Sequence, residues 1–443
     1  MRFSTLFLAG LGLAAGASGA SAQQINGDST SDGRTVLVIQ DVLEDIVRSF
    51  EHYHLLLLDA AGKPTDLLPL ESYLSGGITT SEFDFRFASD SGDYLLVIAS
   101  PVDGTRRLFH GRVLDGRFLE MEKILEYQGS DRHWIYLPAI SRDGKVRACI
   151  VQDQTLIPAD PDQLPLGSYS LWIQHGKETR TIENVRPAFA LSRDGSRIAY
   201  LRSGEDPYDH IRFKSSFLVV EPVDGKGEPR TLAHGFLIAD PRQIGLIWAP
   251  DGRSIYAIGA MAGRQSPAVG DKVSHNLPLF YSQPVRPTLI RFQLSEDGEV
   301  EKIEKIWRHQ AGFWMKPSPN GRWFFAFSTL TKKEQQAWFF ETNTGRKVLY
   351  REGDKAGRPC PGMIPAPVLP RYLPVWKDDD HLLMLDLPGG WLKGQEVGHD
   401  PILLPKELQK LVDFFTNPGA ARNYLDEQAA KASSKKAGET KGS

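Results

Sequence analysis

Ser192-Arg193-Asp194-Gly195-Ser196-Arg197-Ile198-Ala199-Tyr200 is one copy of a short phrase that recurs along the chain. An Asp-Gly pair between two apolar runs predicts a tight β-hairpin, because glycine adopts positive φ without steric cost. Further copies begin at Ser89, Ser141, Ala249, Ser318 and, in decayed form, Lys377. Successive copies lie roughly 50 to 70 residues apart, and a period of that size predicts a modular array of hairpins.

The acidic residues of these turns have two possible roles. They could be metal ligands or catalytic carboxylates, or they could shape the turns by accepting backbone N–H groups. We interpret them as structural. The residues assigned to this role are Gly92, Asp143, Gly144, Asp194, Gly195, Asp251, Gly252, Asn320 and Gly321.

A second series of turns alternates with the first and is centred on Gly116, Gly176, Gly225, Gly298 and Gly345. Two hairpins supply four antiparallel strands, which make one propeller blade. The sequence therefore predicts an all-β fold, a six-bladed β-propeller with short flanking helices. The sixth repeat, near residues 372–387, has only the first hairpin. We expect residues near 54–70 to supply its outer strands, so that N- and C-terminal strands together close the ring.

The repeat resembles that of a known family. Residues 192–200 and 249–257 are similar to the repeats of TolB-like propellers, also called WD40-like or PD40 repeats. The resemblance covers roughly residues 50–390 and implies a six-bladed propeller. It does not extend to the α/β domain that precedes the propeller of TolB, because the chain ahead of the first repeat is too short.

The two ends of the chain predict export and short additions to the ring. Arg2, the apolar stretch Leu6 to Ala15 and the small residues Ala20-Ser21-Ala22 form a secretory signal. We therefore expect a periplasmic or secreted protein without a transmembrane segment. The predicted organisation is a signal peptide at 1–22, a disordered leader at 23–34, an amphipathic helical segment at 35–53, the propeller at 54–390, a C-terminal extension with a helix at 391–430 and a disordered tail at 431–443.

Composition and motifs exclude several classes of function. The net charge is −3, from 52 basic and 55 acidic residues, with no basic stripe, so we expect no nucleic-acid partner. Hydrolase-elbow, phosphate-loop and zinc-protease motifs do not occur in the sequence. We therefore expect no cofactor and no metal. Cys149 and Cys360 could pair in an oxidising compartment or remain separate thiols, and the sequence leaves this open.

The candidate ligand-binding residues lie in the segments that cross from one repeat to the next, where a channel mouth is expected. They are His133, Trp134, Arg186, Gln243, His309 and Arg371. Converging arginines suit a carboxylate, a phosphate or an acidic peptide, although such residues are also common as solvated loop charges. This assignment places function on the crossing face and leaves the Asp-Gly turns as scaffold.

Two functions from different classes fit these observations. The first is a scaffold in a cell-envelope complex that binds a protein or peptide, and this is the function we favour. The alternative is a propeller enzyme, a lyase or hydrolase acting on an acidic glycan, with His133, Arg186, His309 and Arg371 at the sugar. A fold of this kind supports either function, because propellers host many activities.

Overall fold

A computed structural model gives the architecture. It describes residues 27–44, 49–60, 64–70, 73, 82–88, 90–99, 104–153, 168–203, 216–237, 244–260, 288–308, 313–331, 334–349, 351–352, 355–356, 372–376, 381–386, 391–396, 401–402 and 430.

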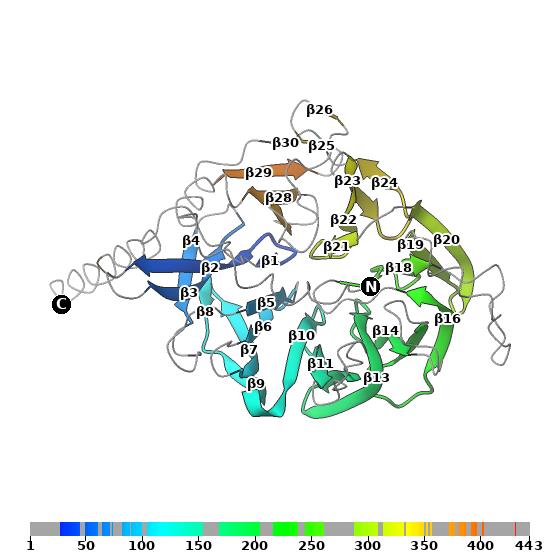
Figure 1. Cartoon of the computed structure of the whole chain (residues 1–443), viewed down its shortest axis with the longest axis horizontal. Helices are drawn as coiled ribbons and strands as arrows, with labels where there is room; N and C mark the ends of the chain where they lie inside the picture. Colours follow the sequence, from blue (N-terminus) through cyan, green and yellow to red (C-terminus); the bar gives the residue numbers. More distant parts are fainter. Residues whose placement is uncertain are drawn as a thin grey trace, which may run out of the picture.

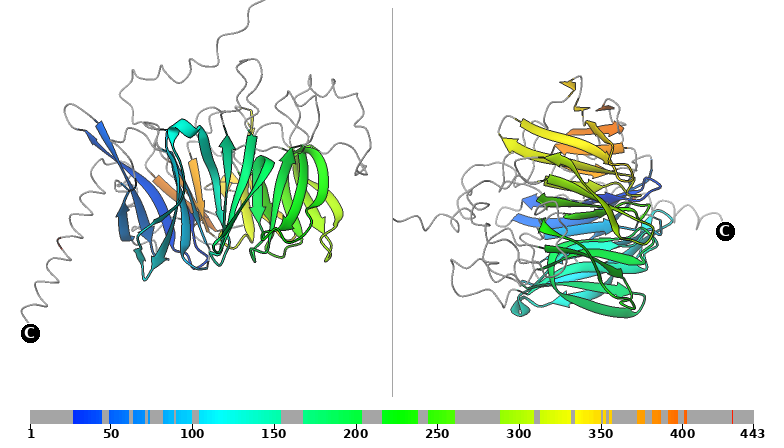
Figure 2. Two further views of the ribbon diagram at one scale, coloured as in Figure 1. Left: turned by 90° about the horizontal axis from the view of Figure 1, so that it is seen from below. Right: turned by 90° about the vertical axis from the view of Figure 1, so that its right-hand side faces the viewer.

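The described residues form antiparallel sheets that stand side by side around a central axis (Figure 1). The strands run along that axis, so each sheet presents a face to the next sheet around the ring (Figure 2). This is a nearly all-β fold in a propeller arrangement, as the repeated hairpins predict.

The strands up to β13 form two separate sheets and the first part of a third. The first sheet is β1 (Gly27–Ser29), β2 (Thr35–Glu44), β3 (Ser49–Leu58) and β4 (Pro64–Pro69). The second is β5 (Glu82–Phe87), β6 (Asp93–Ala99), β7 (Arg106–Leu114), the short β8 (Arg117–Phe118) and β9 (Glu122–Tyr127). After the 3₁₀ turn η2 (Gly129–Asp131) come β10 (His133–Ile140), β11 (Val146–Asp153), β12 (Ser168–His175) and β13 (Glu178–Leu191).

The remaining strands continue the ring. They are β14 (Arg197–Ser203), β15 (Ser216–Pro222), β16 (Arg230–Leu237), β17 (Leu246–Trp248), β18 (Ser254–Ala260), β19 (Thr288–Leu294) and β20 (Val300–Arg308). Then follow β21 (Phe313–Pro317), β22 (Trp323–Thr331), β23 (Glu334–Glu341), β24 (Lys347–Leu349), the small hairpin β25 (Arg351–Glu352) with β26 (Lys355–Ala356), and β27 (Tyr372–Trp376), β28 (His381–Asp386), β29 (Trp391–Glu396) and β30 (Pro401–Ile402).

The described strands fall into seven groups of four main strands each, whereas the sequence predicts six blades. Strands β10 to β20 form one continuous eleven-stranded ladder, but it contains three groups. The long strand β13 pairs with β12 through its first half and with β14 through its second half, after a register shift between Val185 and Phe189. Strand β16 likewise pairs with β15 and then, through Phe236 and Leu237, with β18.

The extra group lies at the N-terminal end, where the prediction fails. The segment 35–53 is not a helix: β2 and β3 pair over ten residues, from Thr35 opposite Leu58 to Glu44 opposite Ser49. The run Thr35-Val36-Leu37-Val38-Ile39 is rich in β-branched residues, which favour strands and outweigh the helical spacing of the apolar positions. The leader also contributes, because residues 27–29 form β1 and pair with β2.

The sequence predicts that residues 54–70 complete the C-terminal sheet and so close the ring, and this is wrong because these residues pair within the N-terminal sheet. Strand β4 pairs with β3, not with the C-terminal sheet, and β27 to β30 complete their own four-stranded sheet. Residues 391–402, assigned to an extension, therefore belong to the ring. The signal segment, the proposed C-terminal helix near 405–415 and the tail lie outside the described residues, and so do the long loops at 154–167, 204–215 and 261–287.

The hydrophobic core lies between neighbouring sheets, because successive side chains of a strand point to opposite faces. In β6, Tyr94, Leu96 and Ile98 pack toward the first sheet, whereas Leu95 and Val97 pack toward the third. All seven residues of β6 are buried, as expected for a strand that is covered on both faces. Three further clusters join the third group to the fourth, the fourth to the fifth and the fifth to the sixth.

Trp376 joins the last sheet to its neighbours on both sides. Its ring is fully buried, lies 5.8 Å from the ring of Phe339 and donates from Nε1 to the Lys316 carbonyl at 2.9 Å. Its own carbonyl accepts a hydrogen bond from the Ser29 hydroxyl in β1. The first and last sheets are thus in contact, and the ring closes between sheets rather than within one.

Candidate functional site

The Asp-Gly turns define one end of the ring, which we call the turn face. Ser141 shows how a turn is built: its hydroxyl donates to Asp143 at 2.7 Å and accepts the Val146 N–H at 2.9 Å. Ser192 makes the same two contacts, with Asp194 and Arg197. The glycines at 92, 144, 195, 252 and 321 have φ between 69° and 78°, the left-handed region in which a side chain is strained. These residues shape the turns as the repeat requires.

A cavity of about 230 Å³ lies on the ring axis at the turn face. The inner strands β10 and β13 line it with their last residues and with the turns that follow, and β17 and β21 do the same. Strands β1 and β5 complete the wall through Asp28 and Arg86. Each inner strand runs toward this face and ends there, so the repeat itself brings equivalent positions of successive sheets around one opening.

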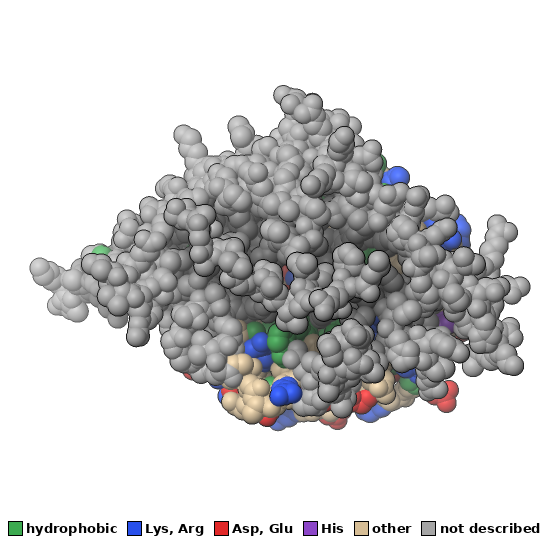
Figure 3. Space-filling model, in the orientation of Figure 1, with side chains coloured by type: hydrophobic (Ala, Val, Ile, Leu, Met, Phe, Trp, Pro, Cys, Tyr) green, Lys and Arg blue, Asp and Glu red, His purple; other side chains and the backbone are tan. Residues whose placement is uncertain are grey.

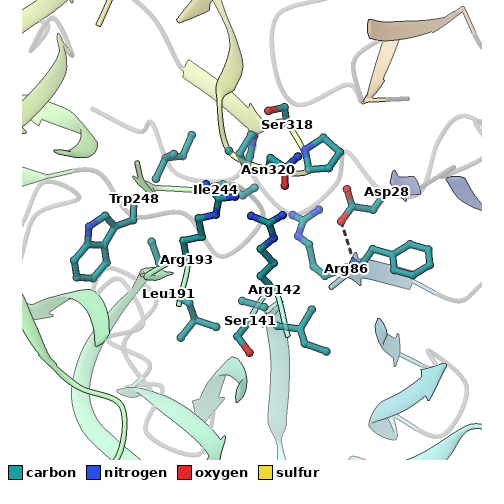
Figure 4. Close-up of a pocket in the computed structure, with 18 of the residues that line it drawn as sticks. Asp28, Arg86, Ser141, Arg142, Leu191, Arg193, Ile244, Trp248, Ser318 and Asn320 are labelled. Carbon is teal, nitrogen blue, oxygen red and sulfur yellow. Dashed lines mark hydrogen bonds between the residues drawn. The ribbon is translucent and has the colours of Figure 1, made fainter. Parts of the chain in front are cut away.

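Three arginines from successive sheets extend into this space (Figure 4). Arg86 belongs to β5, and Arg142 and Arg193 occupy the second position of the turns that follow β10 and β13. Arg193 is exposed, while Arg86 and Arg142 are half-buried. Guanidinium groups that converge in this way suit an anionic oxygen ligand, since each offers several N–H donors in a fixed plane.

Acidic residues offset part of this charge. Arg142 forms an ion pair with Asp90, and the Asp90 N–H donates to the Arg142 carbonyl at 3.2 Å. Asp28 lies beside Arg86 and accepts the Phe87 N–H through Oδ2 at 3.0 Å. Asp84 also acts on the lysine of the wall, so among the described residues three carboxylates stand against three guanidinium groups and a lysine, an excess of one cationic group.

Lys316 is the lysine of this wall. It lies in β21, next to the end of the strand, and only 6% of it is exposed. Burial lowers the pKa of Lys316 to about 8; Asp28 opposes the shift and Arg86 adds to it. The four residues Arg86, Arg142, Arg193 and Lys316 are called the basic cluster below.

The residues predicted from sequence to bind a ligand are placed elsewhere or fall outside the described residues. His133 and Trp134 begin β10, at the end of the strand opposite the turn face; the His133 ring stacks on Tyr127 at 4.7 Å, and Arg106 lies 4.5 Å over the Trp134 ring. Arg186 donates to the Ser216 hydroxyl at 3.1 Å. None of these three lines the cavity. Gln243, His309 and Arg371 lie outside the described residues.

The basic cluster was missed because the repeat was interpreted only as scaffold. Two copies of the phrase read Ser-Arg-Asp-Gly, and both arginines point to the axis. A cation at a fixed position of a repeat is brought to one locus when the repeats form a ring, and this signal was present in the sequence. No repeated motif predicts that Arg86 and Lys316 face the axis. They lie within strands, and the sequence does not show which of their side chains point toward the axis.

The opposite face, toward the viewer in Figures 1 and 3, is described only in part. Its described surface lies mainly in the lower part of the ring, with smaller patches along the right-hand edge, and a hollow near the centre exposes apolar and basic side chains (Figure 3). Within the described ranges, no group of three or more His, Cys, Asp or Glu side chains is placed to hold a metal ion. No helix in the described part of the chain is long and apolar enough to cross a membrane.

Comparison with known proteins gives similarity in fold alone. No family model matches the sequence, and no curated protein does. An acylaminoacyl peptidase in complex with Z-Gly-Gly-Phe-chloromethyl ketone has a TM-score of 0.50 at 10% identity, over 87% of this chain and 52% of that one. The chain thus spans about half the length of that peptidase.

Two further solved structures are similar at lower scores. Oligogalacturonate lyase in complex with manganese has a TM-score of 0.44 at 12% identity, over 87% of this chain and 92% of that one. TolB from Acinetobacter baumannii has a TM-score of 0.32 at 12% identity, over 82% of this chain and 77% of that one. These similarities concern the fold alone, and one fold can host many functions, so the site must indicate the function.

Proposed function

We propose that this protein is an exported β-propeller that binds an acidic segment of a partner protein at the turn-face cavity, as a scaffold in a cell-envelope complex. The observation that carries the proposal is the convergence of Arg86, Arg142 and Arg193 on one cavity. The N-terminal signal sequence supports export.

The charge and shape of the cavity favour a carboxylate carried on a chain. An opening of about 230 Å³ admits a side chain or a chain end but not a folded domain. Aspartate or glutamate side chains fit this volume and pair with guanidinium groups through two parallel hydrogen bonds. The surrounding turns are held rigidly by their Ser and Asp side chains, so little order is lost when a ligand binds.

A direct test measures the binding of a fluorescent oligoglutamate peptide by anisotropy, with oligoglutamine as the neutral comparison. We expect the wild-type protein to bind oligoglutamate more tightly than oligoglutamine. Arg193→Gln should weaken oligoglutamate binding by about tenfold, the effect of losing one charge-assisted contact.

The matched control is Arg253→Gln. Arg253 follows the equivalent turn of the next group, is 59% exposed, pairs with Glu296 and does not line the cavity. This variant should bind like the wild type. Equal losses in both variants, or no preference for oligoglutamate, would contradict the proposal.

A further inference from the structure

Lys316 combines three properties that binding of an acidic peptide does not require. It is almost fully buried, it lines the cavity, and the nearest charged groups include both signs: Asp28 and Asp84 favour its protonated form, whereas Arg86 opposes it. A lysine that served only as a counter-charge would be better placed in solvent, because burial penalises the cation.

Burial at this site changes the chemistry of the amine. With a pKa of about 8, the neutral fraction of Lys316 at pH 7 exceeds that of an exposed lysine by more than about a hundredfold. A neutral amine is a nucleophile, and desolvated lysines form imines with carbonyl compounds. Lys316 is among the residues that line the cavity, which is where a small molecule would meet it.

The rest of the basic cluster defines which carbonyl compound fits. Arg86, Arg142 and Arg193 share the cavity with Lys316 and suit a carboxylate. A molecule that carries a carboxylate close to an aldehyde or ketone would satisfy both features in a cavity of this size. A neutral aldehyde would satisfy only one.

We propose that Lys316 forms an imine with small carboxylate-bearing carbonyl compounds, such as 2-oxo acids, which the three arginines of the cavity orient. The amine nitrogen attacks the carbonyl carbon, and the carbonyl π electrons move to oxygen. The resulting carbinolamine loses one water, which carries away the carbonyl oxygen, and the product is an imine. This activity goes beyond the binding function proposed above and does not require a protein partner.

The test is reductive trapping on the full-length mature protein. The probe is glyoxylate with cyanoborohydride, which converts an imine to a stable secondary amine, and peptide mass mapping locates the carboxymethyl group. Lys145 is the internal control, because it lies in a neighbouring turn with 73% of its side chain exposed. We expect Lys316 to be labelled at least about tenfold faster than Lys145 at pH 7. Labelling at Lys316 no faster than at Lys145 would overturn the proposal.

Two comparisons separate an oriented site from a merely reactive amine. Arg193→Gln should slow labelling of Lys316 by glyoxylate and leave its labelling by acetaldehyde unchanged, since acetaldehyde has no carboxylate. Equal effects on both probes would contradict the role of the arginines. Lys316→Arg removes the amine and keeps a cation, so it should abolish labelling at this position. Trapping without oligoglutamate binding would sink only the scaffold function, and binding without trapping would sink only the imine.

Discussion

At the scale of single residues, the unusual features of this protein lie where charge is buried. Lys316 is the clearest case, because the strand β21 carries it into the wall of the channel rather than to the surface. Arg142 and Arg193 are held at the second position of rigid turns, and both line the cavity. These three side chains therefore determine the chemistry of the cavity.

The buried lysine predicts how stability depends on pH. The pKa of Lys316 is lower in the folded protein, about 8, than in the unfolded chain, about 10.5. Between these values the unfolded chain binds a proton that the folded protein releases, so the free energy of unfolding rises with pH. Lys316→Met should remove this rise and should stabilise the protein by roughly 3 kcal/mol below pH 8.

Urea denaturation of the wild type and the variant at pH 7, 8, 9 and 10 measures the difference. Above pH 10 the buried tyrosines Tyr94, Tyr200 and Tyr256 oppose the trend, because burial raises their pKa and the unfolded chain then ionises first. Their contribution is common to both proteins and cancels in the comparison. The free energy of unfolding of the wild type minus that of the variant should rise between pH 8 and 10, and a difference that stays constant or falls would contradict the buried position of Lys316.

At the scale of elements, arginines tie the third group of strands to the fourth, the fourth to the fifth and the fifth to the sixth. Arg180 of β13 donates to the Pro222 and Val223 carbonyls in the following group and pairs with Glu221 at 2.7 Å. Arg291 of β19 reaches the Asn343 and Thr344 carbonyls in the same manner, and Arg230 of β16 reaches the Asp297 carbonyl. The second series of turns is thereby fixed by the neighbouring sheet, which the sequence alone does not reveal.

Arg180→Gln tests this contact between sheets. Glu221 is 5% exposed, so the variant leaves a buried carboxylate without its cation and should lower the free energy of unfolding by about 3 kcal/mol. Arg253→Gln breaks an exposed pair with Glu296 and should cost no more than about 1 kcal/mol. Chemical denaturation measures the free energy of unfolding of both variants. Similar losses in the two would mean that the Arg180 contact between sheets stabilises the protein no more than an exposed ion pair does.

The sequence predicts hairpins well because a tight turn depends on a few neighbouring residues. It predicts strands poorly where their pairing partners lie further along the chain. Asp194-Gly195 identifies its hairpin because the turn needs only four residues. The segment 35–53 was assigned to a helix because Ile39, Val42, Leu43 and Ile46 recur at helical spacing, whereas pairing of β2 with β3 decides the strand. The repeat marks Arg142 and Arg193, but Arg86 and Lys316 join the basic cluster because distant segments meet around the ring, and no local pattern encodes that.

At the scale of the whole molecule, closure rests on the contact between the first and last sheets. Trp376 is fully buried between Phe339 and the Lys316 carbonyl, and its own carbonyl accepts from Ser29. Trp376→Ala should lower the free energy of unfolding by about 3 to 5 kcal/mol, the cost of emptying a large aromatic site. Hydrogen exchange should then increase first in β1 and β27. Exchange that increases uniformly, or not at all, would count against this closure.

Export adds a prediction about the mature chain. The Ala20-Ser21-Ala22 site predicts removal of the first 22 residues, so Edman sequencing of protein from the envelope fraction should begin at Gln23. Recovery of the full chain with Met1 from the cytoplasmic fraction alone would show that the segment is not a working signal.

The central claim, that a partner engages the turn-face cavity through its basic cluster, is tested most directly by photo-crosslinking in intact cells. A photoreactive phenylalanine analogue at Pro319, which lines the cavity, is compared with the same analogue at Lys177, an exposed position on an outer turn. We predict a discrete crosslinked product from position 319 that is lost when Arg193→Gln is added and is absent from position 177. A product that persists in the Arg193→Gln background, or that forms equally from both positions, would contradict the claim.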